Sequence, residues 1–407
     1  MQTYYKRHIK KAIDSNLKDY PSVLLTGARQ VGKTTIFENE YNYKMISFDN
    51  INILESIKND ATGVIASYDK PLVIDEVQRE QNVFTALKYL IDKDKKNGEY
   101  LLTGSQKFEL MKNVSESLSG RIGILQLLGL SNRELNNEEF YDAFIPTKDY
   151  LLNRKPKNSF NQKKIWENIQ RGSFPKLYDE TDFDFERFYS NYIDTYVERD
   201  VRSILNVTNL YTFIQFMTVL ASRTGQVLNM NDIAKDIGIN VGTVKKWLSV
   251  LETSNLIYFL QPFSLNVNKR IIKSPKIYFT DTGIVCYLCK WLTAETLKNG
   301  AMSGQIFETY VVSEILKSYY NAGKKPKIFY FRNTDAQEVD LVFYENGKIY
   351  PIEIKATNKA DVRTIKGFKV LSTYFPNVEI SSGGIICTEE ELMPLGNDKY
   401  IIPVDYI

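Results

Sequence analysis

Residues 21–37, PSVLLTGARQVGKTTIF, contain the pattern from which the fold of this chain can be inferred. An apolar run over 23–26 leads into Gly27-x4-Gly32-Lys33-Thr34, and a helical pattern follows. Strand, glycine-rich turn and helix in this order predict a phosphate-binding loop, whereas an ordinary glycine turn would not need the Lys-Thr pair. Lys33 is expected to reach the β- and γ-phosphates of a nucleotide, and Thr34 to bind Mg²⁺. The predicted nucleotide-binding residues of the loop are Gly27, Ala28, Arg29, Gln30, Val31, Gly32, Lys33, Thr34 and Thr35.

Two later strands end in polar groups that could serve this loop. Residues 71–78, PLVIDEVQ, are an apolar strand followed by two adjacent acids. We expect Asp75 to hold Mg²⁺ through water and Glu76 to polarise the attacking water, while capping of the next helix is the alternative. Residues 99–106, EYLLTGSQ, end in Thr103, Gly104 and Ser105, which we expect to sense the γ-phosphate at the carboxyl edge of the sheet.

Arg121 lies just before another apolar strand, in SESLSGRIGILQL at 115–127. Two interpretations stay open: a solvated arginine beside a strand, or one that reaches a nucleotide across a subunit interface. Strands alternate with helices over residues 20–130, and this alternation predicts a parallel sheet covered by helices on both faces.

The combination GARQVGKTT, LVIDEVQ, LLTGS and SLSGR resembles the AAA-type P-loop ATPases that carry a C-terminal domain of unknown function, a widespread prokaryotic family. The resemblance covers nearly the whole chain. It implies ATP rather than GTP as the nucleotide, a sensor position near Ser105, and an arginine-finger candidate at Arg121. Relatives of this type often act as rings, so the resemblance also raises a homo-oligomer as a partner.

The middle of the chain is predominantly helical. Residues 131–210 are polar and predict a helical connector. Residues 211–290 then show a helix-turn-helix pattern, NMNDIAKDI and VGTVKKWLSVLETS, followed by two short strands, and the unit resembles a winged helix. In DNA-binding versions the second helix enters the major groove and the wing contacts phosphates, whereas in others the unit only packs against protein. The predicted DNA contacts are Lys245, Lys246, Lys269, Arg270 and Lys273.

Residues 303–356 read as a helix followed by three strands, with Asn346-Gly347 as the turn of the last hairpin. Asp340 and Glu353 fall on adjacent strands, and Lys355 lies on the same face as Glu353. Two carboxylates can bind Mg²⁺, and a lysine can orient or activate a water for attack on a phosphodiester. Glu308, on the preceding helix, is expected to reach the same metal. A solvent-facing set of strand charges is the alternative.

This order resembles the restriction-endonuclease-like nuclease superfamily, whose signature is a helix acid, a strand acid and then Glu-x-Lys. The resemblance implies catalytic roles for Glu308, Asp340, Glu353 and Lys355, with Asp340 and Glu353 as metal ligands. Glu338 is a further acid on the Asp340 strand.

Composition is that of an ordinary globular protein. The chain has 407 residues, 43% apolar and 25% charged, and a formal charge of only +3, so any nucleic-acid surface must be local. No apolar run of about 18 residues and no leader-like h-region occur, and three cysteines suit a reducing compartment, which together predict a cytoplasmic protein without a membrane partner.

The sequence therefore predicts an α/β protein of four parts: an AAA-type ATPase domain at 1–130, the connector at 131–210, the winged helix at 211–290, and a nuclease-like domain at 291–407. Two functional hypotheses stay open. In the first, ATP and Mg²⁺ control a DNA-bound endonuclease. In the second, the chain is an ATP-driven switch that binds DNA or protein and carries an inactive nuclease-like domain.

Overall fold

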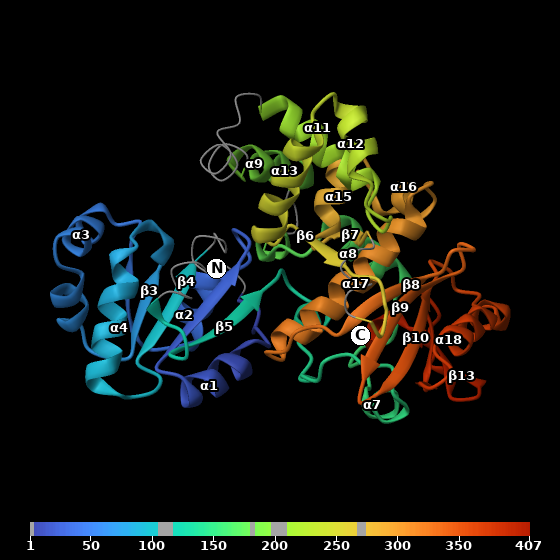
Figure 1. Ribbon diagram of the computed structural model, residues 1–407, viewed down its shortest axis with the longest axis horizontal. Coiled ribbons are helices and arrows are strands. Elements are labelled where there is room, and N and C mark those ends of the chain that lie inside the picture. Colours follow the sequence, from blue (N-terminus) through green and yellow to red (C-terminus); the bar gives the residue numbers. More distant parts are fainter. Residues whose placement is uncertain (1–3, 105–116, 180–183, 197–209, 267–273) are drawn as a thin grey trace.

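The protein is described by a computed structural model that covers residues 4–104, 117–179, 184–196, 210–266 and 274–407. Figure 1 shows a sheet with its helices near the N-terminus, a second sheet formed by the C-terminal residues, and helices that lie between and above them. None of the helices in these ranges is long and apolar enough to span a bilayer.

The N-terminal sheet has five parallel strands in the order β2-β3-β4-β1-β5. Its strands are β1 (Ser22–Gly27), β2 (Lys44–Ser47), β3 (Leu72–Asp75), β4 (Tyr100–Gly104) and β5 (Ile122–Leu127). Its helices are α1 (Lys10–Asp19), α2 (Lys33–Glu40), α3 (Ile51–Ala66) and α4 (Asn82–Asp94), with a 3-10 turn at Val77–Arg79.

Alternate side chains of β1 enter two different cores, because successive side chains of a strand point to opposite faces of the sheet. Val23 and Leu25 belong to a core that includes residues of α1 and α2. Leu24 belongs to a second core with residues of α3 and α4. The prediction of a parallel sheet with helices on both faces is confirmed.

The central part is almost entirely helical (Figure 1). It contains α6 (Asn132–Leu135), α7 (Lys148–Asn153), α8 (Gln162–Arg171), a 3-10 turn (Pro175–Tyr178), α9 (Phe185–Tyr196), α11 (Leu210–Ser222), α12 (Met230–Ile237) and α13 (Val241–Thr253). Strands β6 (Ile257–Leu260) and β7 (Lys276–Phe279) then pair antiparallel, and α15 (Thr282–Leu288) and α16 (Ala294–Lys298) follow. The order of α12, α13 and the β6–β7 hairpin is the one that the sequence predicts within residues 211–290.

The C-terminal part is a mixed sheet next to a long helix, α17 (Ser303–Asn321). The strand order is β13-β14-β12-β10-β9-β8, with β11 added beside β10. Strands β8, β9 and β10 form an antiparallel meander, whereas β10, β12 and β14 are parallel. The remaining bounds are β8 (Ile328–Arg332), β9 (Glu338–Glu345), β10 (Lys348–Ile354), α18 (Lys369–Tyr374) after a 3-10 segment (Val362–Phe368), β11 (Glu379–Ile380), β12 (Gly383–Cys387), β13 (Met393–Gly396), β14 (Lys399–Pro403) and a 3-10 turn (Val404–Tyr406).

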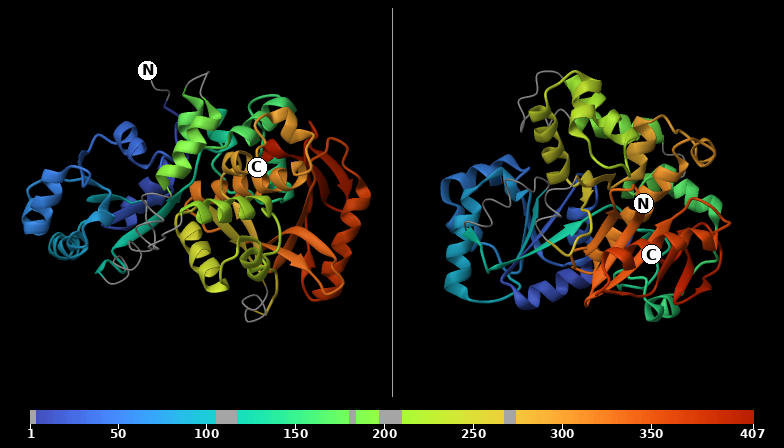
Figure 2. Two further views of the ribbon diagram at one scale, coloured as in Figure 1. Left: turned by 90° about the horizontal axis from the view of Figure 1, so that it is seen from above. Right: turned by 45° about the vertical axis from the view of Figure 1, so that its right-hand side comes forward.

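One hydrophobic core joins these parts. It contains Leu125 of β5, Trp166 of α8, Phe216 of α11, Ile315 of α17 and Ile352 of β10. Helix α17 contacts β5 of the first sheet as well as β7 and β10. The views in Figure 2 show the first sheet at one end of the molecule and the second sheet at the other, with the helices between them.

Candidate functional site

The phosphate-binding loop connects the end of β1 to the start of α2, as predicted. Gln30 and Gly32 both have positive φ, 61° and 93°, and these two left-handed residues curl the loop. A Cβ atom on Gly27 would lie 2.3 Å from the carbonyl oxygen of Leu127, so the close approach of β5 requires glycine there. The Lys33 ammonium donates to the carbonyl oxygens of Gly27 and Ala28 at 3.1 and 2.8 Å, inside this curve.

Asp75 lies at the centre of a hydroxyl network beside the loop. Its Oδ1 accepts hydrogen bonds from the hydroxyl of Thr34 at 3.0 Å and from that of Thr103, and its Oδ2 accepts one from Ser47 at 3.3 Å. Thr103 can reach it because β4 lies between β1 and β3. A carboxylate beside a threonine hydroxyl is the oxygen donor set that suits Mg²⁺, which usually binds one or two carboxylates together with substrate phosphates.

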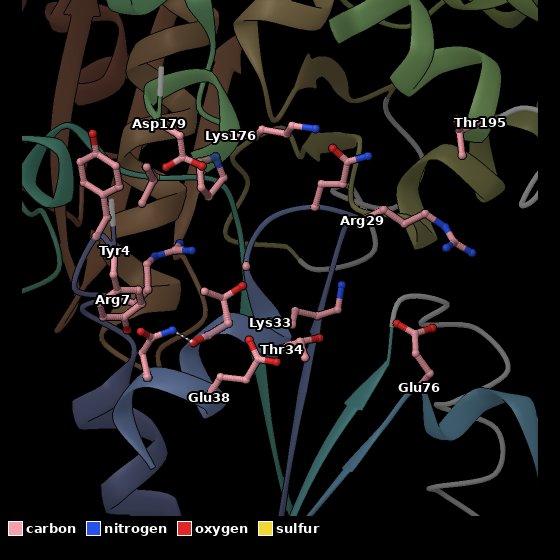
Figure 3. Close-up of a pocket in the computed structure, with 17 residues that line it drawn as sticks. Tyr4, Arg7, Arg29, Lys33, Thr34, Glu38, Glu76, Lys176, Asp179 and Thr195 are labelled. Carbon is pink, nitrogen blue, oxygen red and sulfur yellow. Dashed lines mark hydrogen bonds between the residues drawn. The ribbon is translucent and has the colours of Figure 1, made fainter. Parts of the chain in front are cut away.

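Glu76 follows Asp75 at the carboxyl end of β3. Its backbone is left-handed, with φ 58°, and its main-chain N–H donates to the Thr103 hydroxyl at 3.3 Å. Its carboxylate accepts a hydrogen bond from Gln78 at 2.5 Å. In Figure 3, Glu76 lies beside Lys33 and Thr34, on the side of them opposite to Tyr4 and Arg7.

The loop opens into a cavity of about 640 Å³. Its floor consists of loop residues, but much of its remaining wall comes from the N-terminal segment and from the connector (Figure 3). The wall residues from these two segments, none of which the sequence suggested, are Tyr4, Tyr5, Arg7, Pro175, Lys176, Asp179 and Thr195. No linear motif marks them, because they are brought to the loop from about 20 residues before it and more than 140 residues after it.

Ser105 and Arg121 were also predicted to contact the nucleotide. Ser105 lies outside the described residues. Arg121 precedes β5, whose first residue pairs with Ser22 at the amino end of β1, so it lies at the edge of the sheet opposite the loop. There it forms a two-point ion pair with Asp92, at 2.6 and 3.0 Å. The structure therefore does not bring Arg121 to the pocket of its own chain, because the six-residue strand separates them by about 20 Å.

A second group of predicted residues meets on β9 and β10. Ile352 pairs with Leu341, so Glu353 and Asp340 are the next residues of the two strands. Asp340 accepts hydrogen bonds from the main-chain N–H of Ile354 at 2.8 Å and from the Lys355 ammonium at 3.1 Å. Lys355 also donates to Glu353, at 2.9 Å.

The lysine of this group is more exposed than its acids. The Lys355 side chain is 42% exposed, compared with 14% for Asp340 and 9% for Glu353. Burial and the neighbouring Asp340 carboxylate raise the pKa of Glu353 to about 8, although Lys355 opposes this effect. Two carboxyl groups therefore share a single lysine in partly buried surroundings, the arrangement that raises the pKa of one of the two acids.

Glu308 of α17 has different partners from those expected. Its carboxylate accepts from the Lys276 ammonium at 3.2 Å and from the Tyr278 hydroxyl at 2.5 Å, both on β7. Lys276 is 4% exposed and also pairs with Glu338, at 2.5 Å. Sequence reasoning missed Lys276 and Tyr278, because both lie in the hairpin that it assigned to a separate unit.

The partners of Glu308 bear on one expectation about metal binding. Among the described residues, no three Asp, Glu, His or Cys side chains form a group that could hold a metal ion. Lys276 and Tyr278 engage the Glu308 carboxylate, while burial and the Asp340 carboxylate raise its pKa, so a metal shared by Glu308, Asp340 and Glu353 stays a prediction. The remaining two carboxylates still provide the hard oxygen donors that suit a Mg²⁺ ion, which ordinarily keeps several waters.

The predicted DNA-contacting residues divide into two sets. Lys245 and Lys246 lie exposed on α13, the second helix of the helix-turn-helix pattern. Asn240 caps that helix by accepting a hydrogen bond from the main-chain N–H of Thr243 at 2.8 Å. Lys269, Arg270 and Lys273 lie outside the described residues.

Three protein families match different parts of the chain. The AAA domain matches residues 19–136. A domain of unknown function (DUF8612) matches residues 162–295, and another (DUF4143) matches residues 303–407.

Curated relatives match most of the chain but carry no assigned activity. An uncharacterized protein of Mycobacterium tuberculosis is 25% identical over 389 residues, which cover 95% of this chain and 81% of the relative. An uncharacterized protein of Methanocaldococcus jannaschii is 22% identical over 363 residues, covering 79% of this chain and 74% of the relative.

Solved structures align only weakly with the whole chain. A DNA replication initiation factor aligns at 16% identity and a TM-score of 0.23, over 60% of this chain and 85% of that one. A signal transduction ATPase with a tetratricopeptide repeat sensor from Pyrococcus horikoshii aligns at 13% identity and a TM-score of 0.28, over 79% and 48%. From the family matches and the parallel sheet with its loop, we conclude that this chain carries an AAA-type P-loop ATPase domain followed by a C-terminal domain of the DUF4143 type.

Proposed function

We propose that this chain binds ATP in the cavity above the loop and hydrolyses it with the residues of that cavity. Two observations carry the proposal: Lys33 and Thr34 line a cavity of about 640 Å³, a volume within the range of small-ligand sites, and Thr34 shares the Asp75 carboxylate with Thr103 behind it. The match to the AAA domain supports ATP as the nucleotide.

Each of these side chains has a distinct role in the proposal. Lys33 exchanges its bonds to the loop carbonyls for oxygens of the β- and γ-phosphates. Thr34 and Asp75 would hold Mg²⁺, which neutralises charge on the phosphates when it is bound. Glu76 orients the attacking water and accepts its proton, and Thr103 keeps Asp75 and the main chain of Glu76 in place.

The test is phosphate release from ATP by the full chain in the presence of Mg²⁺. We expect Lys33→Ala to lower the turnover by about 10²-fold or more, since it removes a charged donor from the developing negative charge. Lys58→Ala, an exposed lysine on α3, is the matched control and should keep the wild-type rate. Equal rates in wild type and Lys33→Ala would refute the proposal.

A second function is favoured by the charged group on β9 and β10. We propose that Asp340, Glu353 and Lys355 form a Mg²⁺-dependent site that cleaves phosphodiester bonds of DNA. Support comes from the order of helix α17, meander β8-β9-β10 and parallel strand β12, combined with a lysine held between two carboxylates at 3.1 and 2.9 Å.

In this second proposal the two acids bind the cation and the lysine supplies positive charge. Asp340 and Glu353 would hold the cation, which supplies a polarised phosphate and an activated water when it is bound. Lys355 remains protonated, because both carboxylates raise its pKa against the opposing effect of burial. It therefore contributes positive charge beside the scissile phosphate, and Lys245 and Lys246 contribute phosphate contacts on α13.

Cleavage of supercoiled plasmid and of branched DNA tests this function, in Mg²⁺ or Mn²⁺ and with or without ATP. We expect Lys355→Ala to abolish nicking and Lys359→Ala, an exposed lysine four residues further on, to retain it. Lys33→Ala reports whether ATP controls the reaction. If wild-type protein hydrolyses ATP but cleaves neither DNA, the alternative stands: an ATP-driven switch that binds DNA or protein and has an inactive nuclease-like domain.

A further inference from the structure

Arg7 is a buried arginine that holds the phosphate-binding loop from outside. It is only 5% exposed. Its Nη1 donates to the carbonyl oxygen of Val31 at 2.6 Å, within the loop. Its Nη2 donates to the carbonyl oxygens of Leu128 and Gly129, at 2.8 and 3.3 Å. One guanidinium group thus joins the loop to the segment that follows β5.

The hydrogen bond from Arg7 to the Val31 carbonyl also orients an N–H group of the loop. The carbonyl of Val31 and the N–H of Gly32 belong to one planar trans peptide, so they point in opposite directions. When Arg7 holds the carbonyl, the Gly32 N–H is fixed as well, and main-chain N–H groups of such loops are the donors that bind phosphate. Arg7, whose three guanidinium nitrogens all donate to protein oxygens, therefore sets the orientation of a phosphate-binding donor.

The third nitrogen of the Arg7 guanidinium, Nε, contacts the connector. Its Nε donates to Glu134 at 3.0 Å, and both side chains are at most 3% exposed. The other carboxylate oxygen of Glu134 accepts from the main-chain N–H of Ser131 at 2.8 Å, which completes a capping box at the start of α6. The carboxylate thus fixes α6 relative to Arg7.

Helix α6 is in turn attached to α17. The main-chain N–H of Asn132 donates to Glu314 of α17 at 2.8 Å, and Glu314 accepts from Lys317 at 2.7 Å. Both of these charged side chains are at most 5% exposed. The same helix carries Glu308, two turns earlier, in the charged group with Lys276.

We propose that Arg7 is a positioning residue of the nucleotide site, and that through Glu134 it couples nucleotide binding to the packing of α17. The proposal rests on the proposed ATP site and names its regulation. Buried contacts run from Val31 through Arg7, Glu134 and Asn132 to Glu314, and they give a route by which a rearranged loop can shift α17. If Arg7 served only to stabilise the fold, its ion pair with Glu134 would be enough. Its hydrogen bond to the Val31 carbonyl is the contact that acts on the loop.

The first measurement is ATP affinity by isothermal titration, together with the melting temperature without nucleotide. Arg7→Lys keeps a charge for Glu134, but a single ammonium cannot also reach the three carbonyl oxygens. We expect its ATP dissociation constant to rise about tenfold, a coupling of ordinary size. Arg7→Met/Glu134→Leu removes both charges together and leaves no buried ion alone. It should also lose ATP affinity, and its melting temperature should fall, because the Val31 carbonyl and the Ser131 N–H lose their partners. Binding is therefore compared at a temperature at which both proteins are folded.

The second measurement uses a site remote from the cavity. Glu314→Leu/Lys317→Leu replaces the ion pair on α17, which does not line the nucleotide pocket. We expect about fivefold weaker ATP binding, because coupling is reciprocal. Arg154→Leu/Glu138→Leu is the control, a separate buried ion pair of the connector, and should bind ATP like wild type.

These measurements distinguish failure of the proposed ATP site from failure of the proposed Arg7 role. If wild type binds no ATP, the proposed function fails. If wild type binds ATP and Arg7→Lys binds it equally well, the positioning role is refuted. If Arg7→Lys is impaired but the α17 variant and its control bind alike, the coupling to α17 is refuted.

Discussion

At the scale of single residues, the Glu134 carboxylate links pH to stability. Burial alone would raise its pKa, but Arg7, His8 and main-chain N–H donors outweigh burial and lower the pKa from 4.5 to about 2. A carboxyl with a lower pKa in the folded state stabilises the fold above its unfolded pKa, and the stabilisation is lost as pH falls toward the folded pKa. The shift corresponds to about 3 kcal/mol.

We therefore predict that acid weakens wild type more than Glu134→Gln. The variant should be less stable at pH 7 by about 3 kcal/mol, because it leaves the Arg7 charge buried without its partner. The difference in the urea midpoint between the two proteins should shrink as pH falls from about 4.5 toward 3. Glu139→Gln, at an exposed neighbour, is the control. A constant difference over this range would contradict the assignment.

At the scale of elements, strand β7 supplies Lys276 to acids of α17 and β9. Lys276→Met should destabilise the protein by about 3–5 kcal/mol, because Glu308 and Glu338 lose the buried ammonium between them. Lys276→Met/Glu308→Gln should recover part of the loss. Lys324→Met, an exposed control just after α17, should stay within about 0.5 kcal/mol of wild type in urea unfolding. Equal midpoints for the two single variants would show that the hairpin does not depend on this ion pair.

Helix α13 allows a prediction about DNA. Lys245→Ala/Lys246→Ala should weaken binding to any DNA sequence and reduce the slope of log affinity against log salt by about two, since each phosphate contact contributes about one. Binding is measured by fluorescence anisotropy at several salt concentrations. Lys93→Ala/Lys96→Ala removes two exposed lysines near the first sheet and should leave the slope unchanged. An unchanged slope for the α13 variant would show that these two lysines do not contact DNA phosphates.

The sequence was informative wherever the determining residues are neighbours in the chain. The loop 27–34 follows a buried strand, and the Asn346-Gly347 turn has φ values of 51° and 75°, the left-handed pair expected for a two-residue hairpin. The roles of Lys276 and Arg7 were missed because their partners lie 32 and 127 residues away in the chain. Hydrophobic periodicity does not indicate contacts between residues so far apart in the sequence. The same reason explains why Lys276 and Tyr278 were not among the partners predicted for Glu308.

At the scale of the whole molecule, the nucleotide cavity lies between the first sheet and the connector. A ligand bound there should stabilise both, because residues of each line the cavity. We predict that ATP at about 100 times its dissociation constant raises the free energy of unfolding by about 2.7 kcal/mol. Scanning calorimetry with ATP should show this shift in wild type and none in Lys33→Ala. Equal shifts in both proteins would place the bound nucleotide elsewhere.

We propose that Glu76 acts on ATP held by Lys33, Thr34 and Asp75. The most direct measurement is the conversion of radiolabelled ATP by excess protein with Mg²⁺, in wild type and in Glu76→Gln. We expect Glu76→Gln to bind ATP with wild-type affinity but to convert it about 10²–10⁴-fold more slowly, because a positioned base usually contributes a factor of this size. Conversion at the wild-type rate by Glu76→Gln would show that Glu76 is not the base.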